Sequence, residues 1–183
     1  MCLMLAVFQY GCNMTELKTA LANSANVETI EASSYITGKK SGVFAYLAAP
    51  TATTVTTAGT YVPISGTFTN DPIQDFITVA DPAIQYKGTK TQYYKIDWQA
   101  SCSCNNTGRT VKIGIKKNAA ASPLASSVME TYLKVANETQ ALAGCVVVEL
   151  ATDDKIQLVV TSSVNGDQIT FANYTTSIEE FFD

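Results

Sequence analysis

The sequence predicts an all-β protein, an antiparallel jelly-roll sandwich that follows a short, partly helical amino-terminal arm. From residue 60 onward, apolar and polar side chains alternate with a period of two, and the resulting strands recur between turn residues at short intervals. Hydrophobic residues make up 46% of the 183-residue chain and charged residues 15%, which suits one core and not a disordered chain. We therefore expect an arm over residues 1–58 and a jelly-roll head domain over residues 59–183.

The clearest strand of the predicted sandwich covers residues 93–104. Its apolar face carries, at every second position, Tyr94, Ile96, Trp98, Ala100, Cys102 and Cys104. The intervening residues are mostly polar, and the Asn-Asn-Thr-Gly sequence at 105–108 then predicts a turn. The alternation therefore places Tyr94 and Trp98 in the core.

The same alternation predicts the other strands of the head domain. Residues 111–116 and 155–162 each place Val, Ile or Leu at every second position. Further strands are expected at residues 67–68, 76–79, 132–136, 142–150 and 169–178. The Asn-Gly-Asp sequence at 165–167 predicts a tight hairpin turn before the last of them. These segments account for roughly eight to ten strands with no helix among them.

The arm is predicted to contain one short helix. Residues 15–23 carry apolar side chains at helical spacing behind a capping Asn13 or Thr15, and they are too few to drive a coiled coil. A short strand is expected at residues 43–47. Residues 48–59, which are rich in Ala and Thr and poor in charge, are expected to form a linker to the head domain.

The first residues of the arm form an apolar segment that we expect to dock on a partner. Its apolar and aromatic members are Leu3, Leu5, Val7, Phe8 and Tyr10. No Lys or Arg precedes them, and the uninterrupted apolar run at residues 3–8 is shorter than a signal peptide requires and far shorter than the about 20 residues of a membrane span. We therefore expect no membrane insertion, and a lipidated anchor at Cys12 stays an alternative.

Composition argues against several classes of function. Histidine is absent, so no Ser-His-Asp triad, Cys-His dyad or histidine-ligated zinc can form. The formal net charge of -4 argues against nucleic-acid binding, and no glycine-rich phosphate loop is present. We expect no enzyme activity and no cofactor. A hydrolase with two carboxylates, such as the adjacent Asp153 and Asp154, is the alternative, although a turn explains this pair more simply.

The five cysteines form an odd set without a repeated spacing, which favours a reducing compartment over a disulfide framework. Cys102 and Cys104 are separated by one residue, whereas zinc-binding thiolates usually come as two pairs with about two to four intervening residues. Because both thiols fall on the apolar face of a strand, we expect them to be buried and expect no metal site. Metal binding by this pair is the alternative.

Three tyrosines, Tyr86, Tyr93 and Tyr94, cluster around one predicted hairpin. Exposed tyrosines can serve as anchors of an interface or as platforms on which sugars stack. On alternating strands about half of such residues belong to the core instead. A binding surface at this hairpin is therefore an open interpretation.

Four stretches of the chain occur in the order found in one family of β-sandwich domains. They read Gly-Thr-Tyr-Val-Pro-Ile-Ser-Gly-Thr-Phe at 59–68, Ile-Gln-Tyr-Lys-Gly at 84–88, Val-Lys-Ile-Gly-Ile-Lys-Lys-Asn at 111–118 and Val-Val-Glu-Leu-Ala-Thr-Asp-Asp-Lys-Ile-Gln-Leu at 147–158. Through them, residues 57–183 resemble the trimeric jelly rolls of tumour-necrosis-factor-like (TNF-like) and complement-globular-head-like type found in bacteriophage virion proteins. Residues 1–56 show no such resemblance.

The resemblance implies a structural, non-catalytic role as a homotrimer on a virus particle. Such domains serve as head decoration or cement proteins, as head fibres, or as tips of tail fibres and spikes. Because the chain is too short for a long fibre shaft, we expect a capsid decoration or cement protein or a head fibre. Its arm would bind the major capsid protein or another shell protein, at the capsid surface of a virion assembled in the host cytoplasm. The alternative is a fibre tip that binds a host surface glycan or receptor.

Burial of apolar surface gives a physical reason for threefold closure. A small sandwich leaves a sheet edge and an apolar flank exposed, and three copies can cover both without leaving an open surface. We expect the core or the trimer interface to contain the aromatic residues Tyr94, Trp98, Phe171, Phe181 and Phe182. The two phenylalanines at the end of the chain would be exposed to water in a monomer.

Overall fold

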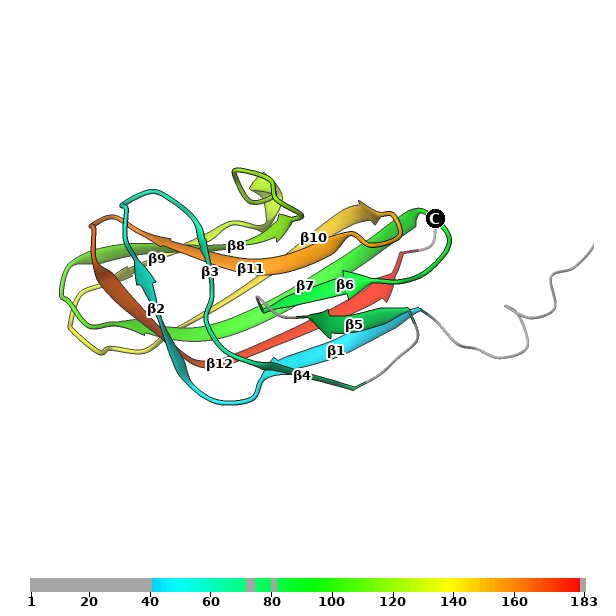
Figure 1. Cartoon of the computed structure of the whole chain (residues 1–183). Coiled ribbons are helices and arrows are strands. Elements are labelled where there is room, and N and C mark those ends of the chain that lie inside the picture. Colours follow the sequence, from blue (N-terminus) through cyan, green and yellow to red (C-terminus); the bar gives the residue numbers. More distant parts are fainter. Residues whose placement is uncertain (1–40, 72–74, 80–81, 182–183) are drawn as a thin grey trace, which may run out of the picture. The chain divides into compact units, whose positions relative to one another are not determined.

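Twelve strands in two antiparallel sheets make up the part of the chain that the structure describes, which is residues 41–71, 75–79 and 82–181 of a computed structural model. The sheets form two layers (Figure 1). The predicted docking residues Leu3, Leu5, Val7, Phe8 and Tyr10, the predicted helix at 15–23 and Phe182 lie outside the described residues.

The first layer, here named the β7 sheet, has the strand order β10-β7-β12-β1-β4, and β2 also pairs with β12. Its strands are β1 (Gly42–Leu47), β2 (Thr51–Val55), β4 (Phe68–Asp71), β7 (Gln92–Cys104), β10 (Gln140–Leu150) and β12 (Asp167–Glu180). β1 and β2 follow one another along the same edge of β12, from the pair Gly42–Glu179 to the pair Val55–Asp167.

The second layer, here named the β11 sheet, has the strand order β5-β6-β11-β8-β9, and β3 also pairs with β11. Its strands are β3 (Val62–Pro63), β5 (Phe76–Val79), β6 (Ala83–Tyr86), β8 (Arg109–Lys117), β9 (Met129–Leu133) and β11 (Lys155–Ser162). A 3-10 turn, η1 (Ala125–Ser127), completes the edge of β8, because the Ser127 hydroxyl accepts a hydrogen bond from the Ile115 N–H at 2.8 Å.

The core lies between the two sheets and contains the alternate residues that the sequence pattern predicts. On β7, the residues from Tyr94 to Cys104 at every second position are all buried, and on β8 and β11 the predicted inward side chains are buried as well. The antiparallel jelly-roll prediction is therefore confirmed, as is the tight turn at 165–167, where Gly166 has a φ of 77°.

The predicted boundary between arm and head domain is wrong. The compact unit runs over Lys40–Asp183, and it includes β1 and β2, which were assigned to the end of the arm and to a linker. Ala and Thr in residues 51–55 suggested a linker, but Thr53 and Val55 are buried, and the segment pairs with β12 over its whole length. Pairing with a distant strand thus overrides weak local preference.

Two smaller differences concern individual strands. The strand expected at 132–136 is β9, which ends at Leu133, and residues 134–139 form the loop that follows it. β6 was expected only as part of the resemblance at 84–88, yet it pairs with both β5 and β11. Its buried Tyr86 packs on Phe76 with ring centroids 5.2 Å apart.

Candidate interaction surface

The outward face of the β7 sheet carries an unusual set of exposed side chains for a water-facing surface. Two aromatic residues of β1, Phe44 and Tyr46, are 41% and 39% exposed, and Tyr93 of β7 and Val147 of β10 are exposed on the same face of the sheet. We name this surface the outer face. Its remaining central residues are the small or uncharged Gln99, Ala143, Cys145, Thr175 and Ser177, together with Lys95 and Asp97.

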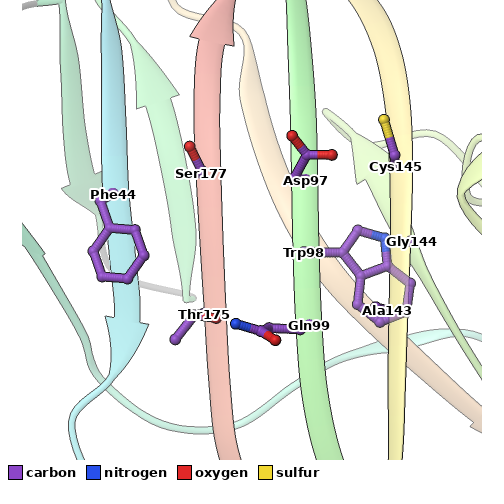
Figure 2. Close-up of a pocket in the computed structure, with 9 residues that line it drawn as sticks. All are labelled: Phe44, Asp97, Trp98, Gln99, Ala143, Gly144, Cys145, Thr175 and Ser177. Atoms are coloured by element: carbon purple, nitrogen blue, oxygen red, sulfur yellow. The ribbon is translucent and has the colours of Figure 1, made fainter.

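A shallow hollow of about 450 Å³ lies at the centre of the outer face. Four strands line it, as Figure 2 shows: Phe44 comes from β1, Thr175 and Ser177 from β12, Asp97 and Gln99 from β7, and Ala143 and Cys145 from β10. Phe44, Ser177, Asp97 and Cys145 belong to one row of cross-strand neighbours. The hollow is open and mostly apolar, a shape that suits a protein contact better than a deeply enclosed small molecule.

The Trp98 side chain lies beneath the hollow, on the core side of the β7 sheet. Its indole extends from β7 to β10 at Gly144, its cross-strand partner (Figure 2). A Cβ atom at position 144 would lie only 2.7 Å from the indole nitrogen, so only glycine leaves room for the ring. The indole N–H has no hydrogen-bond partner, which leaves packing as the interaction that holds the ring.

Gly144→Ala is expected to lower the free energy of unfolding by about 1–3 kcal/mol, because the added methyl group overpacks the site of the indole. Denaturant unfolding of the two proteins measures the difference. The effect should be smaller in a Trp98→Phe background, where the smaller ring makes room. An equal loss in both backgrounds would contradict this explanation.

One ion pair lies on the outer face. Lys95 Nζ is 2.7 Å from Asp97 Oδ2, and the hydrogen bond to Asp97 raises the pKa of the lysine. Partial burial raises the pKa of the Cys145 thiol, and a hydrogen bond to Asp97 raises it further. Cys145 is therefore held in its protonated form and is a poor nucleophile at neutral pH.

β10 forms an edge of the β7 sheet beside the outer face. Among the described residues it pairs only with β7, over Gln140–Leu150. The strand contains neither Lys nor Pro, the residues that commonly protect an edge from further pairing, and Glu149 is its single charged side chain. Lys117 Nζ donates to the Glu149 carbonyl at one end of the strand. A long edge with a single charge is normally covered by another chain or another segment.

The structure separates the five aromatic residues that were expected in the core or at a trimer interface. Tyr94, Trp98 and Phe171 are buried in the core. Phe181 is not in the core: its side chain is 45% exposed, although its N–H donates to the Tyr93 carbonyl. Phe181 follows β12, and the described residues leave its side chain partly open to solvent. Its place at a trimer interface stays a prediction.

The tyrosine hairpin is mostly part of the core. Tyr86 and Tyr94 pack together with ring centroids 5.1 Å apart, and Tyr94 also makes an edge contact with Phe76 at 5.2 Å. Tyr93 alone of the three points outward, onto the outer face. The alternating pattern explains this division, and it leaves no row of exposed tyrosines at the hairpin.

The carboxylates of Asp153 and Asp154 belong to the turn between β10 and β11, as predicted. Each pairs with a lysine: Asp153 with Lys87, and Asp154 with Lys117 at 2.8 Å. Partial burial would raise the pKa of Asp154, but hydrogen bonds from Asn118, Lys117 and the Ala151 N–H lower it overall. These partners stabilise the turn and tie it to β8.

Cys102 and Cys104 lie in the core with reduced thiols, as the alternation predicts. Burial raises the pKa of Cys102 to about 11. Within the described residues, no group of three or more histidine, cysteine, aspartate or glutamate side chains could hold a metal ion. A separate search of the same residues finds no helix with the length and apolar character needed to cross a membrane.

Asp167, which sequence reasoning did not single out, forms the most deeply buried charged site of the described chain. Its carboxylate is 0% exposed and accepts hydrogen bonds from Ser162 at 2.6 Å, Asn106 at 2.9 Å and Arg109 Nε at 3.0 Å. The site ties the β7–β8 turn to the β11–β12 hairpin. Only the Asn-Gly-Asp hairpin signal marked its position in the sequence.

Comparison with solved structures shows that the fold is TNF-like. The chain is similar to the Eiger TNF of S. frugiperda, with a TM-score of 0.55 and 8% identity over 79% of this chain and 94% of that one. It is also similar to murine APRIL, with a TM-score of 0.51 and 7% identity over 77% of this chain and 99% of that one. No family model and no curated protein matches the chain. Identities this low show the fold alone.

Proposed function

We propose that this TNF-like jelly roll is a non-enzymatic structural protein of a bacteriophage virion, a homotrimer that decorates or cements the capsid surface. The sequence resemblance over residues 57–183 supports the virion assignment. The outer face supports the homotrimer, because it exposes Phe44, Tyr46 and Val147 and ends at β10, an edge strand with no second strand partner among the described residues. This combination of apolar face and open edge is the observation that carries the proposal.

A threefold arrangement uses both features at once. When the β10 edge of one copy packs on the outer face of the next, the contact is between two different surfaces, and such contacts form rings if the rotation closes. Closure after three copies leaves neither the β10 edge nor the outer face of any copy open. A twofold contact between outer faces alone would leave the edges of β10 exposed.

The position of the chain's entry point supports attachment through the arm. β1 begins at Gly42, opposite Glu179 near the end of β12, so the chain enters and leaves the sandwich at one end. The loops at 105–108, 134–139 and 163–166 lie at the opposite end of the same strands (Figure 1). A protein held by its amino-terminal residues would present these loops to solvent.

Light scattering should give a solution mass close to three times the 19.6 kDa of the chain. The reason is that burial of the outer face and the β10 edge removes exposed apolar surface from water. A monomer or a dimer at micromolar concentration would contradict the homotrimer. The mass of a Val135→Ser variant, changed at an exposed loop residue at the far end, should be the same.

Deletion of residues 1–10, which include the predicted docking residues, should abolish binding to purified capsid shells of the virus that carries the gene and leave the trimer mass unchanged. Cosedimentation with shells measures binding, and Val135→Ser serves as the control that still binds. If the chain instead adsorbs to host cells and ignores shells, it is the receptor- or glycan-binding tip and not a decoration protein.

A further inference from the structure

The Lys95–Asp97 pair is the polar centre of an otherwise uncharged part of the outer face. Each side chain is 44% exposed, and Asp97 lines the hollow together with Phe44 and Cys145. Lys95 is the only cation that β1, β7, β10 and β12 place on this face. Its charge is therefore the one that balances the acidic groups there.

Two further acidic residues border the pair. Glu179 of β12 is the cross-strand neighbour of Lys95, and Glu149 of β10 is the neighbour of Tyr93, one row farther toward the chain ends. In the other direction the next row consists of Tyr46, Thr175, Gln99 and Ala143, none of which is charged. The pair thus lies where the acidic margin of the outer face meets its uncharged centre.

We propose that a second copy of this chain covers the Lys95–Asp97 pair, and that the pair determines how neighbouring copies fit together. This inference rests on the homotrimer proposed above. A second copy is the occupant that the surface fits, because each copy offers both an apolar face and, at β10, an edge strand with no second strand partner among the described residues. Because Lys95 and Asp97 neutralise each other, the pair offers no net charge to a strongly charged ligand.

The size of the face is appropriate for such a contact. Four strands about 4.8 Å apart, with about five rows of outward side chains about 6.6 Å apart, span roughly 600 Å². A stable protein interface buries about 800 Å² on each partner. The outer face with the adjoining β10 edge therefore approaches the area that one contact in a trimer needs.

When a second copy covers the pair, the stability of the contact depends on whether both charges are present. An ion pair removed from water is tolerated when its two charges are satisfied by each other, whereas one charge left alone is costly. The surrounding side chains are small or apolar and would permit the copies to slide. With an ion pair at one row of the face, the favourable arrangement of two copies is the one that buries both charges while they remain paired.

The test is a double-mutant cycle on the full chain, with trimer dissociation followed by sedimentation over a range of concentrations. Lys95→Met should weaken the trimer at least about tenfold, because it leaves Asp97 without its cation under the second copy. Adding Asp97→Leu should restore the affinity to within about threefold of the unchanged protein. The two substitutions are therefore expected to be strongly non-additive.

The matched control is the Lys112–Glu130 pair, which joins β8 to β9 at 2.8 Å on the outward face of the other sheet. Lys112→Met should leave trimer dissociation unchanged. If Lys95→Met has no effect on a protein that is trimeric, or if the double variant is weaker still, the inference is wrong and the trimer stands. If the unchanged protein is monomeric, the homotrimer itself is wrong.

Discussion

Asp167→Ala is expected to lower the free energy of unfolding by about 3 kcal/mol, because it breaks a buried ion pair. The substitution leaves the Arg109 guanidinium without its partner and removes an acceptor from Ser162 and Asn106. The Ser162 hydroxyl and Arg109 Nε then lose the acceptor that they have in this site, while Arg109 Nη1 keeps the Thr107 carbonyl and Asn106 keeps Asn105 Oδ1. Urea unfolding at neutral pH and fixed protein concentration measures the loss.

The control for Asp167 is Asp153→Ala, which removes an exposed carboxylate that also pairs with a lysine. Its effect should stay within about 1 kcal/mol, as is typical of ion pairs in contact with water. Equal losses for the two variants would show that burial of Asp167 does not set the size of the effect.

The same network predicts a dependence of stability on pH. Burial alone would raise the pKa of Asp167, but hydrogen bonds from Ser162, Asn106 and Arg109 lower it below its ordinary value of 3.8. The folded chain therefore holds the ionised form more strongly than the unfolded chain does. The stabilisation is present above pH 3.8 and is lost as the pH falls through the lower pKa of the folded state. The difference between the unchanged protein and Asp167→Asn should accordingly shrink in acid.

Tyr94→Ala is expected to lower the free energy of unfolding by about 3–5 kcal/mol. The buried ring contacts Phe76 and Tyr86, and the hydroxyl donates to Ser41 Oγ at 3.0 Å. Truncation therefore opens a cavity between the sheets at the point where β1 begins. Tyr94→Phe keeps the ring and removes only the hydroxyl, so it should cost about 1 kcal/mol.

An exposed tyrosine provides the comparison for Tyr94. Tyr132 lies on β9 with its side chain in solvent, and Tyr132→Ala should change stability by at most about 0.5 kcal/mol. Thermal or chemical unfolding distinguishes the two variants directly. A Tyr94→Ala protein as stable as Tyr132→Ala would mean that the cluster with Phe76 and Tyr86 does not hold the sheets together.

The alternation of apolar and polar residues predicted side-chain direction correctly wherever one face of a strand is buried and the other faces water. It placed Trp98, Cys102 and Cys104 in the core and Lys95 and Asp97 on the opposite face of β7. It failed for β2, whose Thr-rich sequence has little preference of its own. It also misplaced β9, because Val135 lies in the adjoining loop and yet continues the apolar pattern.

The candidate surface could be predicted only in part. The exposure of Tyr93 follows from alternation along β7. Nothing local indicates that Phe44 from β1 and Ala143 from β10 line one hollow, because they lie far apart in the sequence and meet only through β12 and β7. The same holds for Arg109 and Asp167, whose charges meet across a turn and a hairpin.

The sequence by itself determined the class of fold and the inward or outward direction of most side chains, because the pleat of a strand turns successive residues to opposite faces. The order of the strands, the inclusion of β1 and β2 in the sandwich, and the free edge at β10 were decided only in the tertiary structure. These depend on which distant strands bury the most apolar surface and satisfy each other's backbone groups together. No local sequence pattern contains this information, because it depends on contacts across the whole chain.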